Sequence, residues 1–288
     1  MVLLNVRAGG ALDDRKRVAD ALGDAQFEAD VLAVVPKELT STARAAIARG
    51  VRLVIAAGGD GTINAVAAAV AGTQAALGVL PVGTLNHFAR DLGMPSDLTQ
   101  AARILARGHV RQVDFGEVNG RLFLNNCSIG LYPSLVIRRE EQRQRLGRGK
   151  WLAMLMAFLS LFKRYPLVRL ALDERGRSQS CKTPLVFVGN NRYETDLLNL
   201  GRRHGLNGGE LSVYFADAPS RLRLLQLVFR AIIGRLGMEK NFQAMCVKSL
   251  TIESRKRKLK VAMDGEVLRL VPPLQFRIRA GELRVVAP

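Results

Sequence analysis

The chain has 288 residues, of which 48% are hydrophobic, and it carries a formal net charge of +18. This length suits one large domain or two ordinary ones, and the composition excludes a disordered or collagen-like protein. The three cysteines are far apart and odd in number, which argues against a disulfide framework and for a reduced, cytoplasmic protein without a signal peptide.

The charge is divided unevenly along the chain. Residues 1–118 hold 12 basic and 12 acidic residues, whereas residues 119–288 hold 31 basic and 13 acidic residues. We therefore expect two domains with these bounds, the second of which meets an anionic surface. The alternative is a solvated basic face without a specific partner.

The first domain alternates strand and helix patterns. Strands are predicted at 2–6, 29–35, 51–57 and 76–83, and helices at 13–25, 41–50, 62–72 and 97–108. Asp97 stands where it can cap the last of these helices. Strands that alternate with helices of about ten residues predict a parallel sheet covered on both faces.

After Asp114 the pattern changes to short β-rich runs separated by turn residues. Asn119-Gly120 is a strong hairpin signal between two of these runs. The runs predict an antiparallel all-β domain, interrupted by helices near 136–164 and 219–236. The last strand is compatible with packing back onto the first domain.

One turn of the first domain combines glycines with a carboxylate. The segment "AAGGDGTINAV" (56–66) joins a strand to a helix, at the edge where parallel sheets bind ligands. Glycines and a helix N-terminus suit a phosphate group. A carboxylate would repel phosphate unless Mg²⁺ stands between them, so Asp60 indicates a metal–nucleotide site. The alternative is a tight turn in which Asp60 caps the helix.

A second turn of the same kind follows in "GVLPVGTLNHF" (78–88). It again runs from a strand through glycine and threonine into a helix. Two neighbouring turns of this kind would bring the hydroxyls of Thr62 and Thr84, with several backbone N–H groups, to one nucleotide.

Together, "GGDGTINAV" and "LGVLPVGTLNHFARDLGMP" resemble the diacylglycerol kinase catalytic family, and the likeness continues in "LLNVRAGG", "VDFGEVNGRLFLNNCSIG", "VGNN" and "VAMDGEVLRL". This resemblance implies an α/β protein, with an N-terminal Rossmann-like parallel-sheet nucleotide domain and a C-terminal antiparallel β-sandwich domain. It also implies a lipid kinase that uses ATP and Mg²⁺ to transfer the γ-phosphate to a lipid hydroxyl, such as that of diacylglycerol.

The resemblance further implies roles for individual residues. Glu266 is the expected general base for the lipid hydroxyl, and Asp60 and Asp114 are the expected Mg²⁺-linked acids. From the residues alone, an acid at a hairpin turn is the favoured interpretation of Glu266, since Asp264-Gly265 is a common turn pair. The expected nucleotide contacts are Asn5, Gly58, Gly59, Asp60, Gly61, Thr62, Asn64, Gly83 and Thr84.

Three positions depart from the family pattern. Ala33 or a residue near it stands where the family has a nucleotide-binding threonine, for which Thr40 or Thr42 is a candidate substitute. His87 replaces an acid, and we assign it no role. Gly208 replaces an acid of a structural Mg²⁺ loop, so we expect no structural metal there.

The second domain combines basic and apolar stretches at 138–166, 221–237 and "RKRKLK" (255–260). The apolar run at 151–162 is too short to span a bilayer and suits either core packing or an interfacial helix, with Trp151 the residue most suited to an interface. We expect a lipid substrate and an anionic membrane surface as partners, and a peripheral location on the cytoplasmic side of the inner membrane.

Other functions stay open from the sequence. The chain could be a kinase of a soluble substrate, as NAD kinases are, or a non-catalytic nucleotide-binding regulator. A nucleic-acid partner is not expected, because aromatic residues make up only 6% of the chain and no recognition motif occurs. The identity of the lipid and the oligomeric state do not follow from the sequence, and a homodimer is compatible with it.

Overall fold

The computed structural model describes most of the chain. The described residues are 1–6, 11–130, 168–174, 177–183, 185–193, 203, 205–216, 242–254 and 256–288. The helices predicted near 136–164 and 219–236, together with Trp151, lie outside these residues. Within them, no helix is both long and apolar enough to cross a membrane.

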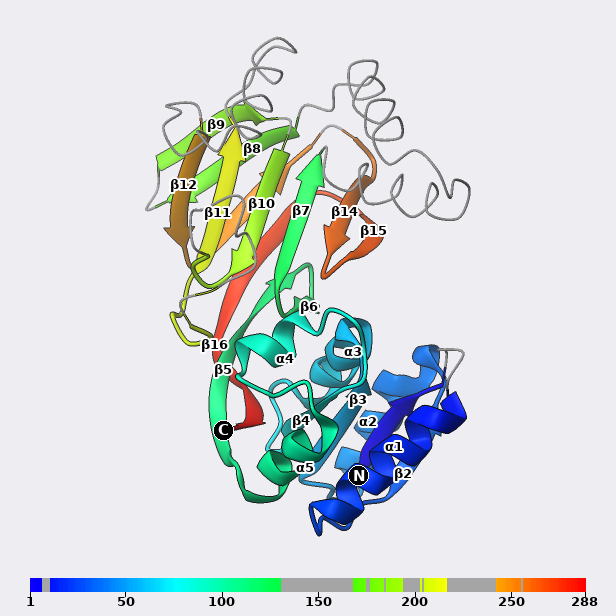
Figure 1. Cartoon of the computed structure of the whole chain (residues 1–288). Helices are drawn as coiled ribbons and strands as arrows, with labels where there is room; N and C mark the ends of the chain where they lie inside the picture. Colours follow the sequence, from blue (N-terminus) through cyan, green and yellow to red (C-terminus); the bar gives the residue numbers. More distant parts are fainter. Residues whose placement is uncertain are drawn as a thin grey trace, which may run out of the picture. The chain divides into compact units, whose positions relative to one another are not determined.

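The chain forms two compact units. Figure 1 shows their helices and strands, with colours that follow the residue numbers. Unit 1 consists of Met1–Phe115, Gly205–Gly209 and Arg279–Pro288, and unit 2 consists of Gly116–His204 and Glu210–Ile278. Two strands run through both units, β5 (His109–Val118) and β16 (Leu274–Ala287). The C-terminal end of β16 thus belongs to the same unit as the N-terminus of the chain.

Unit 1 contains a parallel sheet with flanking helices. Its elements are β1 (Val2–Asn5), α1 (Ala11–Asp24), β2 (Val31–Val34), η1 (Pro36–Glu38), α2 (Leu39–Ala48), β3 (Leu53–Gly58), α3 (Asp60–Val70), β4 (Ala76–Pro81), α4 (His87–Asp91) and α5 (Leu98–Arg107). The strand order is β2-β1-β3-β4-β16, and these neighbours pair in parallel. Residues of β1, β3 and β4 are almost completely buried, as expected for a sheet covered on both faces.

The helices of unit 1 divide into two groups. Helix α1 packs with α5, and α2 packs with α3. Because β2 and β3 lie on opposite sides of β1, right-handed crossovers place α1 on one face of the sheet and α2 and α3 on the other. Asp97 caps α5 as predicted, since its side chain accepts the N–H of Gln100 at 2.8 Å.

Unit 2 is built from antiparallel strands. Its further elements are β6 (Arg121–Phe123), β7 (Asn126–Gly130), β8 (Val168–Glu174), β9 (Arg177–Thr183), β10 (Leu185–Asn190), β11 (Leu211–Ala216), β12 (Phe242–Val247), β13 (Ser249–Glu253), β14 (Leu259–Met263) and β15 (Glu266–Leu270). One sheet has the order β12-β11-β10-β7-β14-β15, and in the other β16, β13, β8 and β9 are neighbours. Buried apolar side chains from both sheets share one core, for example Val188, Val261, Ile252 and Phe276.

The predicted fold class is therefore confirmed: a parallel α/β part and an antiparallel β-sandwich. The predicted turn at Asn119-Gly120 is also confirmed, because β5 and β6 pair around it from Val118 to Arg121. Both turn residues have positive φ, 47° and 77°, which is the backbone of a type I′ hairpin.

Candidate active site

The carboxyl ends of β1 and β3 lie at the point where the strand order of unit 1 reverses. The chain leaves β1 toward β2 and returns to β3 on the other side, so the following helices α1 and α3 lie on opposite faces. Such a switch point leaves a crevice at the carboxyl edge, where open α/β sheets bind ligands. Asn5 and Gly58 end these two strands.

The two glycine turns meet at this edge. Gly58 of β3 is paired with Pro81 of β4, and the turns that follow come into direct backbone contact. A methyl group on Gly83 would come within 2.4 Å of the α-carbon of Gly59 and 2.7 Å of the Asn86 Oδ1 atom. Only glycine allows this approach, so the contact brings two sets of backbone N–H groups together.

Asp60 begins helix α3 but does not cap it. The N-cap residue is Gly59, and no side chain caps the helix. The Asp60 Oδ1 atom instead accepts the N–H of Phe88, at 3.3 Å, from helix α4. The capping role that the sequence left open for Asp60 is therefore not what the structure shows. The amides of Asp60 and Gly61 have no acceptor inside α3, because they belong to its first turn.

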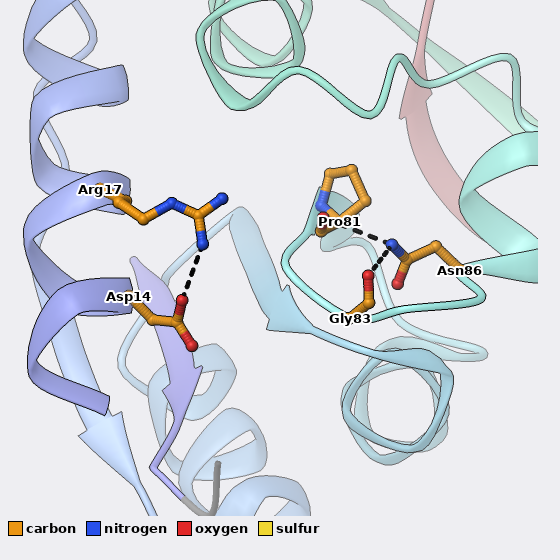
Figure 2. A network of polar contacts seen from close by, with 5 residues as sticks. All are labelled: Asp14, Arg17, Pro81, Gly83 and Asn86. Carbon is orange, nitrogen blue, oxygen red and sulfur yellow. Dashed lines mark hydrogen bonds and ion pairs between the residues drawn. The ribbon is translucent and has the colours of Figure 1, made fainter. Parts of the chain in front are cut away.

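Asn86 fixes the second turn (Figure 2). Its φ is 47°, in the left-handed region, and its Nδ2 donates to the carbonyls of Gly83 at 2.6 Å and Pro81 at 3.4 Å. Its Oδ1 atom is buried without a hydrogen-bond partner, as is the Oδ1 atom of Asn64 on α3. Buried amide oxygens that lack a donor suit a site that binds donors of a ligand or water. The turn leaves Thr84 exposed.

The ends of β1 and α3 are joined by one side-chain hydrogen bond. Asn5 Nδ2 donates to Thr62 Oγ1 at 3.0 Å, and Thr62 is buried.

One of the two candidate substitutes for Ala33 has a structural contact of its own. The hydroxyl of Thr40 donates to the Ala65 carbonyl at 2.9 Å and thereby joins α2 to α3. Ala33 itself is exposed on β2. The predicted contacts Asn5, Gly58 to Thr62, Asn64, Gly83 and Thr84 thus come from neighbouring parts of unit 1.

Asp114 lies on β5 and is 2% exposed. Its Oδ2 atom accepts the N–H of Gly209 at 2.7 Å, and its Oδ1 atom accepts the N–H of Gly281 at 2.8 Å. Both glycines have positive φ, 68° and 67°. The Asp114 carboxylate therefore joins β5, the segment 205–209 and β16 within unit 1, and its predicted role at a metal stays a prediction.

Glu266 belongs to unit 2, where it is the first residue of β15 and exposed. It pairs with Met263 across the Asp264-Gly265 turn, as the hairpin interpretation of the sequence predicted. Its neighbour Asp264 accepts three consecutive backbone N–H groups, from Leu124, Asn125 and Asn126. Burial raises the pKa of Asp264 to about 6, although these amides and the charge of Arg203 lower it.

Two residues of these turns were missed by sequence reasoning. Asn86 directly follows the glycine–threonine pair, and an asparagine in a tight turn is a signal for the left-handed conformation that it adopts. For Asp264 the sequence indicates only a place in a turn. Its partners are about 140 residues away in the chain, so no local signal could reveal them.

The glycine turns offer one carboxylate, that of Asp60, as a ligand for a magnesium ion. Among the residues that the structure describes, no group of three or more His, Cys, Asp or Glu side chains could hold a metal ion. Mg²⁺ commonly binds through one or two carboxylates together with phosphate oxygens and water. Asp60 is half-buried beside the contact of Gly59 with Gly83 and fits this donor set.

Comparisons with known proteins agree with this geometry. Residues 1–118 match the model of the diacylglycerol kinase catalytic domain. A Pseudomonas fluorescens protein described as a YegS-like lipid kinase is 31% identical over 246 residues, which is 84% of this chain and 80% of that protein. The chain belongs to the diacylglycerol kinase catalytic family. A Bacillus subtilis diacylglycerol kinase is 47% identical over 101 residues, or 34% of this chain and 33% of that protein.

A solved structure extends the likeness to the whole chain. A Bacillus anthracis protein described as a diacylglycerol kinase superposes with a TM-score of 0.76 at 25% identity, covering 100% of this chain and 96% of that one. The structure also shows the surroundings of two residues, His87 and Gly208, that depart from the family pattern. His87 is half-buried, with Nδ1 3.3 Å from Arg90 Nη2, and Gly208 is exposed in the segment that Asp114 holds through Gly209.

Proposed function

We propose that this protein is a lipid kinase that transfers the γ-phosphate of ATP, in the presence of Mg²⁺, to a hydroxyl group of a lipid. The observation that carries the proposal is the contact of Gly59 with Gly83, which joins the turns after β3 and β4 and the start of α3 at the carboxyl edge of the parallel sheet, next to the switch point between β1 and β3. Membership of the diacylglycerol kinase catalytic family and the YegS-like lipid kinases among its relatives support the substrate class.

The glycine turns would bind the phosphates of the nucleotide. Backbone N–H groups of Asp60 and Gly61, at the positive end of the α3 dipole, attract negative oxygens. Asn5 and Thr62 hold the ends of β1 and α3 in register, and the exposed Thr84 hydroxyl is free to add a further contact. The buried Asn64 oxygen is suited to accept a donor from the nucleotide.

Asp60 would hold the metal ion through the oxygen that Phe88 leaves unused. When bound, Mg²⁺ neutralises charge on the phosphate oxygens. Asp114 is the second acid proposed for the metal, and its carboxylate also accepts the N–H groups of Gly209 and Gly281.

Glu266 is the proposed general base. It accepts the proton of the lipid hydroxyl while the hydroxyl oxygen forms a bond to the γ-phosphorus and the bond from that phosphorus to the β–γ bridging oxygen breaks. The products are a phosphorylated lipid and ADP. The Glu266 carboxylate has no partner among the described residues, so it is available for this proton.

The hairpin of β14 and β15, taken together with residues 256–258 that lead into it, is the proposed contact with an anionic membrane. The exposed basic residues of this basic hairpin are Lys256, Arg257, Lys258, Lys260 and Arg269. Lys260 and Arg269 are directly opposite one another across the two strands. Like charges at this spacing repel each other, and anionic headgroups would relieve the repulsion. The same surface would keep the enzyme peripheral, on the cytoplasmic side of the inner membrane.

A transfer assay tests the activity. Purified protein is incubated with γ-labelled ATP, Mg²⁺ and bacterial lipid extract in mixed micelles, beside Asp60→Ala and Glu266→Gln. We expect a labelled lipid with the wild-type protein and a loss of at least about 100-fold in both variants. A labelled soluble product in place of a lipid would instead indicate a kinase of a soluble substrate. Full activity of Glu266→Gln would remove its role as the base.

A second assay tests the membrane contact. The five basic residues of the hairpin are changed to Gln, and binding to phosphatidylcholine vesicles is measured with and without phosphatidylglycerol. The matched control removes five exposed arginines from unit 1, at Arg44, Arg49, Arg52, Arg103 and Arg107. Each basic residue near an anionic surface contributes on the order of 1 kcal/mol. We expect only the hairpin variant to lose the preference for phosphatidylglycerol, and equal losses in both variants would contradict a specific surface.

A further inference from the structure

The turn before Glu266 is anchored by an internal carboxylate. Asp264 Oδ2 accepts the N–H of Leu124 at 2.7 Å, and Oδ1 accepts the N–H groups of Asn125 at 2.8 Å and Asn126 at 3.0 Å. In return the N–H of Asp264 donates to the Asn126 carbonyl at 2.9 Å. Successive N–H groups that converge in this way form a concave binding site for anions. Here a side chain of the same protein fills it.

The carbonyl side of the same segment is held by a cation and polar side chains. Arg203 Nη1 donates to the Leu124 carbonyl at 2.7 Å, and Asn190 Nδ2 donates to it at 2.9 Å. The Tyr193 hydroxyl donates to the Asn125 carbonyl at 2.9 Å. The peptide groups of this segment thus lie between the Asp264 carboxylate and the Arg203 guanidinium, whose charges match the two ends of the peptide dipoles. The segment that anchors the turn is therefore itself held by hydrogen bonds on its other side.

Turn chemistry alone does not account for the carboxylate. Asp264 and Gly265 have φ values of 47° and 86°, so this is a second type I′ hairpin. The first one has Asn119 at the same position with the same φ of 47°. The Asn119 side chain donates to the carbonyls of Val271 and Pro273 and accepts one N–H. An asparagine can therefore adopt the backbone conformation of such a turn. The carboxylate at position 264 is explained instead by the three N–H groups that it accepts.

Glu266 depends on this turn for its position. It is the first residue after the turn, it lies on the edge strand β15, and its own side chain has no partner among the described residues. Across the turn it pairs only with Met263. A general base must come within hydrogen-bond reach of the proton that it removes. A displacement of about 1 Å can cost on the order of 100-fold in rate.

We propose that Asp264 is a positioning residue, which holds the Asp264-Gly265 turn on residues 124–126 and thereby sets the place of Glu266 for proton transfer. The inference rests on the proposed lipid kinase activity and on the role of Glu266 in it. Asp264 touches no reacting atom in this assignment. Its effect on the rate passes through Glu266 alone.

A double-mutant cycle tests this dependence. Asp264→Gly removes the carboxylate and keeps a residue that tolerates positive φ, and Asp264→Asn keeps one acceptor. We expect kcat to fall about 100-fold in Asp264→Gly and by less in Asp264→Asn, with the KM for ATP within about twofold of wild type. In a Glu266→Gln background, Asp264→Gly should lower kcat no further. An equal loss in both backgrounds, or a kcat of Asp264→Gly close to wild type, overturns the proposal.

Asn119→Gly is the matched control. It removes the side-chain bonds of the other type I′ turn and should leave kcat unchanged. Hydrogen exchange measured by mass spectrometry adds a readout that needs no activity: residues 124–126 should exchange at least about tenfold faster in Asp264→Gly and in Asp264→Asn than in the wild-type protein. Unchanged exchange there would refute the anchor. A wild-type protein that labels no lipid, with faster exchange in the variants, would refute the proposed function and the catalytic part of the inference while leaving the anchor in place.

Discussion

The backbones of Gly59 and Gly83 touch, although 23 residues of chain separate them. The first glycine ends the connection from β3 to α3, and the second follows β4. Their contact requires that neither residue has a side chain, since a methyl group on Gly83 would come within 2.4 Å of the Gly59 α-carbon. The two turns therefore act as one backbone surface, and this surface is the proposed phosphate site.

Gly83→Ala should disrupt that surface. The added methyl group must push the two turns apart, which costs about 1–3 kcal/mol of stability, and we expect the KM for ATP to rise at least about tenfold. Gly23→Ala is the matched control, because the methyl group would meet nothing within 4 Å on helix α1. That change should stabilise the protein by about 0.5–1 kcal/mol and leave the KM for ATP unchanged. Thermal unfolding and ATP titration check both results, and an unchanged KM in Gly83→Ala would argue against the shared surface.

Thr62→Val should uncouple β1 from α3. The valine has almost the same shape but cannot accept the Asn5 Nδ2 hydrogen bond, which is 3.0 Å long in the wild-type protein. Removing an acceptor from a buried donor costs about 1–3 kcal/mol, and because Asn5 is half-buried we expect a loss in the lower part of that range. Thr62→Ser keeps the hydroxyl and should cost about 1 kcal/mol or less. Urea unfolding of the three proteins measures the difference, and equal losses in both variants would show that the methyl group matters more than the hydrogen bond.

Asp114→Asn should destabilise unit 1 without any metal ion. An asparagine can accept only one of the N–H groups of Gly209 and Gly281, and the other would face an amide N–H₂ group. We expect a loss of about 1–3 kcal/mol, measured by thermal unfolding in EDTA. A variant that is as stable as wild type in EDTA and differs only when Mg²⁺ is added would instead support a metal ligand as the main role of Asp114.

Asp264 should make stability depend on pH in the acidic range. Its pKa is raised to about 6 from an ordinary value of 3.8, with Arg203 and the buried Cys127 thiol as its charged or titratable neighbours. A raised pKa means that the folded state favours the protonated carboxyl. Its contribution to stability is therefore complete below about pH 4 and is lost as the pH rises through 6.

The measurement is a comparison of wild-type and Asp264→Asn protein by urea unfolding between pH 4 and pH 7. The difference in unfolding free energy should move against the wild-type protein by about 1–3 kcal/mol over this range, because one unit of pKa shift corresponds to about 1.4 kcal/mol. A constant difference would show that Asp264 titrates normally. The ionised carboxylate thus lowers stability at neutral pH, which is consistent with a residue retained for function.

Local patterns predicted much of the architecture. The alternation of strands and helices up to Gly108, the cap at Asp97 and the type I′ turn at Asn119-Gly120 depend on neighbours within a few residues, and all three are confirmed. The glycine turns were recognisable because glycine, threonine and asparagine have strong local preferences. The metal role of Asp60 was predicted from its place in a glycine turn, whereas the role of Glu266 as the base rests on family likeness, since an acid beside an Asp-Gly turn has no local signature of catalysis.

The sequence by itself determined the alternation of strands and helices in the first part and the β-rich character of the second, because hydrophobic periodicity and turn residues act over short distances. Its motifs, rather than its periodicity, carried the likeness to the family. Only the tertiary structure decided which distant groups meet. Asp114 joins amides that are 95 and 167 residues away, and Asp264 binds three amides about 140 residues away. Such contacts are set by the packing of whole strands, because a buried carboxylate must find donors wherever the folded backbone provides them.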